Sequence, residues 1–152
     1  MADKNVIILE NNVQALMNNI SGDDLMKACV AGGLVIKQNA MINASRGRPG
    51  LAIDSGDLTN SIMVEKDKKT ATSASVNVGP SMIYAAIHEF GGVIKAKAAR
   101  ALHFVVDGQH RVAKEVVIPA RPYLRPAVDE HLPEIQAAVE ASLKSSMGKA
   151  LK

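Results

Sequence analysis

The sequence predicts an α+β fold, because its helix-like and strand-like patterns lie in separate stretches of the chain rather than alternating. Apolar residues recur every three or four positions toward both ends, whereas short alternating stretches separated by turn residues occupy the middle. The expected order is two helices, a hairpin, a short helix, a second hairpin and a terminal helix. A length of 152 residues fits one domain, residues 1–152, with one core. We expect an antiparallel sheet of two hairpins, packed by these helices.

The first expected helix spans residues 6–20. Its apolar stripe consists of Val6, Leu9, Val13, Leu16 and Ile20. Ser21 then caps a second helix that runs to about Asn43, and Asp23 and Asp24 lie in its first turn, where the helix dipole favours acidic side chains. The sequence thus predicts two consecutive helices joined by a short turn.

Gly32 and Gly33 lie inside the second helix. Each costs about 1 kcal/mol of helix stability relative to Ala. We therefore expect the helix to pack closely against another backbone at these residues.

Residues 44–57 contain one proline and three glycines, too many for regular structure, and predict a long exposed loop. Residues 60–65 and 72–78 alternate as strands do, and the charged residues 66–69 are expected to make the turn between them. Gly79 and Pro80 are expected to end the second strand. The middle of the chain therefore begins with a hairpin.

Residues 81–90 present Ile83, Ile87 and Phe90 at helical spacing, before Gly91 and Gly92 end the pattern. This predicts a short helix on which Tyr84 and Phe90 also belong to the buried face. Residues 95–100 follow as a basic linker of small residues.

The second hairpin is expected from residues 102–106 and 111–118, which flank the turn dipeptide Asp107-Gly108. Pro119 and Pro122 end its last strand, and Pro126 fits the first turn of the helix that follows. The stripe of that terminal helix consists of Leu132, Ile135, Val139 and Leu143, with Pro133 as a kink or a restart.

Composition narrows the function classes. Eighteen Lys and Arg against fifteen Asp and Glu leave a net charge of +3, far from the concentrated basicity of a dedicated nucleic-acid binder. The single Cys29 cannot form an internal disulfide, and no stretch reaches the roughly 20 apolar residues of a membrane span. We expect a soluble protein from a reducing cytoplasm, without a membrane partner.

The sequence lacks the common catalytic and metal-binding motifs. His88-Glu89 would need a second histidine at position 92, which is Gly92. Cys29 fits a small core residue better than a reactive thiol, and the sequence has neither a Gly-x-Ser-x-Gly elbow nor a phosphate-binding loop. We therefore predict no catalytic residue, no metal, no cofactor and no enzyme activity.

One short segment points to DNA. Arg46-Gly47-Arg48-Pro49 resembles the core of an AT-hook, whose arginines enter the minor groove of A·T-rich DNA. A single copy without close basic neighbours favours an exposed interaction loop instead. The alternative function is a small DNA-binding protein that uses this loop together with Lys95, Lys97 and Arg100.

Three segments carry a more specific signal. They are Asp54-Ser55-Gly56-Asp57-Leu58-Thr59-Asn60-Ser61-Ile62, Tyr84-Ala85-Ala86-Ile87-His88-Glu89-Phe90-Gly91-Gly92 and Ile118-Pro119-Ala120-Arg121-Pro122-Tyr123-Leu124-Arg125-Pro126. In order and spacing they resemble the neck and tail-completion proteins of long-tailed double-stranded DNA bacteriophages, also described as minor tail or virion morphogenesis proteins. One departure is Asp57, where the family commonly has a basic residue.

The resemblance implies a structural virion protein of the head–tail joining region. Such a subunit forms a homo-oligomeric ring, for which we favour sixfold over twelvefold symmetry, and completes or terminates the tail. Its expected partners are other neck, connector and tail proteins, with non-specific contact to genomic DNA. Its expected location is the neck or tail of the virion, after assembly in the host cytoplasm.

The motif residues are expected to serve structure or interface. They are Tyr84, His88, Glu89, Phe90, Gly91, Gly92, Pro119, Arg121, Pro122, Tyr123 and Arg125. The prolines fix backbone angles before binding, and Arg121 and Tyr123 are residue types enriched at interface hot spots. Two interpretations stay open for this last segment: contact between subunits, or a corner from strand to helix in which Tyr123 packs within its own chain.

Overall fold

The computed structural model describes residues 19–45, 56–97, 100–106 and 108–150. The expected first helix at residues 6–20 lies almost wholly outside this part, and so does most of the expected loop, including Arg46 and Arg48.

The long helix α2 (Gly22–Ser45) begins where the sequence predicts. Ser21 Oγ accepts a hydrogen bond from the Asp24 amide, and the Asp24 carboxylate accepts one from the Ser21 amide, both at 3.2 Å. This reciprocal pair satisfies two amides at the helix start. The hydrogen bond from the Ser21 hydroxyl, followed by that from Lys27, holds the pKa of Asp24 well below its ordinary value.

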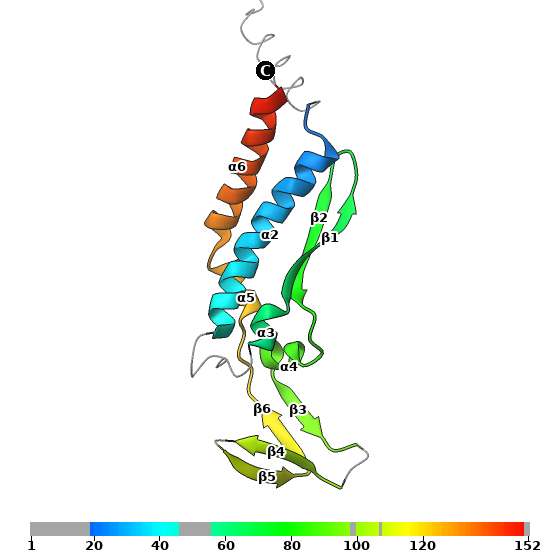
Figure 1. Cartoon of the computed structure of the whole chain (residues 1–152), viewed down its shortest axis with the longest axis vertical. Helices are drawn as coiled ribbons and strands as arrows, with labels where there is room; N and C mark the ends of the chain where they lie inside the picture. Colours follow the sequence, from blue (N-terminus) through cyan, green and yellow to red (C-terminus); the bar gives the residue numbers. More distant parts are fainter. Residues whose placement is uncertain (1–18, 46–55, 98–99, 107, 151–152) are drawn as a thin grey trace, which may run out of the picture.

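Helix α2 lies between helix α6 (Leu132–Ala150) and a hairpin of strands β1 (Ile62–Lys69) and β2 (Ala74–Pro80) (Figure 1). A Cβ atom on Gly32 would lie 2.9 Å from Val139 Cγ2 of α6, and one on Gly33 would lie 2.8 Å from Val64 Cγ1 of β1. Gly32 therefore packs against α6, and Gly33 packs against the β1–β2 hairpin on the other side of α2. The expected close approach is present, although the nearest atoms belong to side chains rather than backbone.

The most deeply buried residues gather near the C-terminal end of α2. The cluster consists of Ala40, Ala44, Ile62, Tyr123 and Ala127. Tyr123 and Ile62 are its large members, so a tyrosine from the third motif segment fills the space left between three alanines.

The β1–β2 hairpin differs from the prediction at both ends. Residues 66–69 belong to β1, and the turn lies at residues 70–73, where Thr70 Oγ1 accepts the Ser73 amide at 2.9 Å. The charged residues stay in the strand because they are exposed there and lose no hydration. Pro80 is the last residue of β2, and the Ser81 amide continues the pairing by donating to Ser61 O.

The short helix α4 (Ala85–Phe90) buries a different face from the one expected. Ile83 precedes the helix and is fully exposed, and Phe90 is 78% exposed. The buried positions are Ala85 and Glu89, four residues apart. The prediction of an apolar Ile83–Phe90 face was wrong because hydrogen bonds to Glu89, described below, determine which face turns inward.

The second half of the sheet structure also departs from the prediction. Strand β4 (Leu102–Val106) pairs with β5 (Gln109–Ala113), and strand β3 (Gly92–Lys95), which was not expected, pairs with β6 (Glu115–Ile118). The expected strand 111–118 is therefore two strands, divided at Lys114. The α+β class is confirmed, but the described strands form three two-stranded sheets rather than one sheet of two hairpins.

Two short helices complete the described chain: α3 (Asp57–Asn60), where a strand was expected to begin, and α5 (Leu124–Asp129). Pro133 is the second residue of α6, so it restarts a helix rather than kinking one. Strands β3 to β6 project from the end of the molecule opposite the C-terminus (Figure 1). We call this projection, residues 92–118, the arm.

Candidate functional site

The three motif segments meet at one place. Helix α3 from the first, helix α4 from the second and helix α5 from the third lie together near the end of α2, just above the arm (Figure 1). We call this meeting point the junction. It connects the helical layer to the arm, so its geometry sets how the arm is held.

Glu89 is the centre of the junction. Its carboxylate is 8% exposed and accepts hydrogen bonds from three consecutive backbone amides, those of Tyr123 at 2.8 Å, Leu124 at 3.0 Å and Arg125 at 2.9 Å. These amides form the start of α5, where the helix has unsatisfied donors and a partial positive charge. Glu89 therefore caps a helix whose N-cap residue, Tyr123, lies 34 residues later in the sequence.

Further hydrogen bonds hold the same segment. The Arg121 amide donates to His88 O at 2.8 Å, and Asn43 Nδ2 on α2 donates to Tyr123 O at 3.2 Å. Burial, together with the negative charge of Glu89, raises the pKa of Tyr123 to about 12. Tyr123 is 1% exposed, so in this chain its ring is part of the core.

Gly91 ends α4 as expected and does so with φ +69°, a conformation that favours glycine. A Cβ atom there would lie 2.7 Å from the Ala120 backbone nitrogen and 3.0 Å from Ile118 O. The backbones of the second and third segments thus approach each other too closely for any side chain. Gly92, expected to help end the helix, instead begins β3.

The remaining motif residues face solvent to different degrees. Tyr84, Phe90, Gly92, Pro119, Pro122 and Arg125 are exposed, whereas His88 and Arg121 are half-buried. Burial and the neighbouring Arg121 charge lower the pKa of His88, so the neutral imidazole is favoured. The motif segments therefore divide into residues that build the junction and residues that remain available on its surface.

The basic residues of the DNA-binding alternative are only partly described. Lys95 lies on β3, where its Nζ is 3.6 Å from the Glu115 carboxylate of β6, and Lys97 and Arg100 are exposed on the segment toward β4. All three are on the arm. Nothing in the described residues relates them to Arg46 and Arg48.

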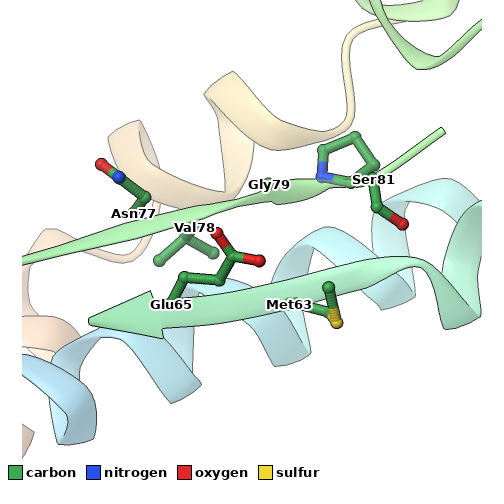
Figure 2. Close-up of a pocket in the computed structure, with 7 residues that line it drawn as sticks. Met63, Glu65, Asn77, Val78, Gly79 and Ser81 are labelled. Carbon is green, nitrogen blue, oxygen red and sulfur yellow. The ribbon is translucent and has the colours of Figure 1, made fainter. Parts of the chain in front are cut away.

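A shallow hollow lies on the β1–β2 hairpin (Figure 2). Its lining consists of Met63, Glu65, Asn77, Val78, Gly79, Pro80 and Ser81. Glu65 is the one ionisable side chain in this lining. Within the described ranges, no group of three or more His, Cys, Asp or Glu side chains is placed to hold a metal ion.

Glu89 was expected from the sequence to serve structure or interface, but its role as the cap of a distant helix was not predicted. A signal was available in the third segment. Helix α5 begins after Pro-Tyr, with no Ser, Thr, Asp or Asn at the capping position, so its first amides need an acceptor from elsewhere. A buried acid in another motif segment is the natural source.

None of the helices in the described part of the chain combines the length and the apolar character needed to cross a membrane.

The fold and the junction define a small α+β protein in which motif residues hold one part of the chain against another. The sequence model of the phage virion morphogenesis family matches residues 35–152. The chain belongs to this family, and its role at that level is the morphogenesis of a phage virion. Comparisons with curated proteins and with solved structures returned no match.

Proposed function

We propose that the chain is a structural subunit of the head–tail joining region, assembled as a ring that completes or terminates the tail and helps connect it to the head. Family membership places the protein in virion morphogenesis. The observation that supports an assembly role is the exposure of two large apolar side chains beside the junction: Ile83 is fully exposed and Phe90 is 78% exposed. Exposed large apolar side chains of this kind are available for a protein contact.

The junction explains how such a contact is prepared. Glu89, Gly91 and the prolines of residues 118–126 fix the backbone before any partner binds, which lowers the entropy lost on association. We propose sixfold rather than twelvefold symmetry, neighbours among the neck, connector and tail proteins, a location in the neck or tail, and no enzyme activity.

Complementation tests this function. A phage that lacks the chain is supplied with wild-type protein, with the Phe90→Asp variant or with a control variant, Met63→Asp. The control changes an exposed side chain on strand β1 of the β1–β2 hairpin. We expect Phe90→Asp to yield filled heads and separate tails, while Met63→Asp restores joined particles. Thermal unfolding of both variants verifies that each is folded. Joined, infectious particles in the absence of the chain contradict the proposal.

The second candidate, DNA binding, is favoured by one observation, the exposed Lys97 and Arg100 on the arm. It predicts affinity for duplex DNA that falls steeply with salt and is abolished by Arg46→Ala with Arg48→Ala. A filter-binding series at several salt concentrations separates the two. Negligible binding at physiological salt removes this candidate.

A further inference from the structure

The arm leaves apolar side chains in solvent. Val93 on β3 pairs directly with Val117 on β6, and both are at least half exposed. Val112 on β5 is 61% exposed, and Val105 on β4 is similarly exposed. Val105 pairs with His110, which is two residues from Val112 on the same strand. Because residues two apart in a strand point to the same face, Val105 and Val112 share one face of their sheet. Val93 and Val117 belong to one two-stranded sheet and Val105 and Val112 to another, so the arm exposes two pairs of valines.

The arm has little of its own to stabilise it. Each of its sheets has two strands, and a two-stranded sheet is at best marginally stable in water. Among the described residues, its strands pack chiefly against each other rather than against a helix. Its attachment is at the base, where Ile87 lies under Gly92 and His88 O accepts the Arg121 amide. A partner that covers the exposed valines would therefore add stability that the arm does not supply itself.

Charge identifies the partner. The arm carries five Lys and Arg, at positions 95, 97, 100, 111 and 114, against two acidic residues. Residues 129–140, from the end of α5 through the first half of α6, carry four acidic residues and no Lys or Arg. The acidic side chains, Asp129, Glu130, Glu134 and Glu140, are all exposed.

An apolar residue accompanies these acids. Leu132, at the start of α6, is 49% exposed and lies between Glu130 and Glu134 in the sequence. The acidic segment therefore offers Glu130 and Glu134 on either side of an exposed apolar side chain, whereas Asp129 and Glu140 pair with Arg125 and Lys144 of their own chain. Complementary charge of this kind fixes the orientation of a contact and speeds its formation.

We propose that the arm docks on the acidic segment, residues 129–140, of a second copy of this chain. Arm and acidic segment are different surfaces, so the contact is head to tail and leaves a free arm and a free acidic segment at its two ends. Repetition of the contact closes a ring. This inference rests on the proposed ring and names the two surfaces that build it.

Single-cysteine variants test the contact directly. In a Cys29→Ser background, one preparation carries Val112→Cys and another Glu134→Cys, and the two are mixed with a short bismaleimide crosslinker. We expect a covalent dimer in the mixture and none in either preparation alone. Replacing Glu134→Cys by Met63→Cys on the outer hairpin provides the matched control, which should not crosslink to the arm.

Charge reversal supplies the second measurement. Lys97→Glu with Lys114→Glu should weaken self-association about tenfold or more, measured by sedimentation at low salt, and adding Glu130→Lys with Glu134→Lys to the same chain should restore most of it. Stability of each variant is followed by urea unfolding.

The outcomes separate this inference from the ring itself. A wild-type chain that stays monomeric contradicts both. An oligomer that is unaffected by charge reversal contradicts only the docking inference. A crosslink in the Val112→Cys preparation alone contradicts it as well, because it would show that the arms of two copies contact each other. Loss of duplex DNA binding in the arm variants, with the oligomer intact, assigns the arm to DNA and also overturns the inference.

Discussion

At the scale of single residues, Glu89 has the largest effect on the structure. A buried carboxylate is costly unless its oxygens are satisfied, and here three backbone amides satisfy them. The same bonds cap α5, orient α4 and place Tyr123 in the core. One side chain thus links two motif segments that stand 34 residues apart.

Glu89→Gln is expected to lower the free energy of unfolding by about 2–4 kcal/mol, because it removes the charge and turns an amide group toward backbone donors. Urea unfolding measures this as a lower midpoint at an unchanged slope. The control, Glu65→Gln on the outer hairpin, should remain within about 0.5 kcal/mol of wild type. A Glu89→Gln chain as stable as that control contradicts the capping role.

Tyr123 predicts a loss of stability at alkaline pH. Its pKa is raised from 10.0 to about 12, so the folded chain holds the proton more tightly than the unfolded chain. The resulting stabilisation, up to about 3 kcal/mol, is complete below pH 10 and is lost as the pH rises from 10 through 12. Tyr123→Phe should therefore lose less stability over this range than wild type.

The matched control for this prediction is Tyr84→Phe, since Tyr84 is the other tyrosine and is exposed. Its stability should follow the wild-type pH profile. The prediction fails for Tyr123→Phe if its profile and that of wild type coincide between pH 10 and 12.

At the scale of elements, α2 organises the molecule by presenting two glycines to two different neighbours. Gly32 admits Val139 and Ile135 of α6, and Gly33 admits Val64, Val76 and Val78 of the hairpin. The helix loses some intrinsic stability at both positions and gains close packing on both sides. Its two contacts hold the helical layer together without large side chains.

Gly32→Leu should destabilise the protein by about 1–3 kcal/mol, because Val139 leaves no room even for a Cβ atom. Combining it with Val139→Ala should recover part of the loss, so the two changes are not additive. Thermal unfolding of the single and double variants measures this coupling. Additive losses would show that α2 and α6 do not meet closely at Gly32.

The elements that local sequence determines were predicted well. Ser21 and Asp24 determine the start of α2, and Gly108, with φ +74°, lies between β4 and β5 where the sequence predicts a turn, while Asp107 lies outside the described residues. The stripe of α6 through Ile135 and Val139 was also predicted, and both residues contact α2 at Gly32.

Elements that depend on distant partners were not predicted. Strand β3 has four residues, and its pairing with β6 runs from Gly92 with Ile118 to Lys95 with Glu115, so neither its length nor its pattern identifies it. The buried face of α4 depends on amides of residues 123–125 rather than on its own periodicity. For the same reason the motif segments were recognised by resemblance, while the way they fit together required the structure.

At the scale of the whole molecule, the chain has a packed helical layer, a junction and an arm. The helical layer contains the deepest core, and the junction anchors the base of the arm through the backbone of residues 118–126. The exposed apolar side chains concentrate at the junction and on the arm. This distribution suits a subunit that is folded before assembly and contacts a neighbour through the arm.

The proposed function is tested most directly by a cryo-EM reconstruction of the head–tail junction in particles assembled with this chain. We predict a ring of copies of this fold between the filled head and the tail, with the arm of each subunit lying on residues 129–140 of the next. Density for the chain elsewhere in the particle, or a complete head–tail junction without it, would contradict the proposed function.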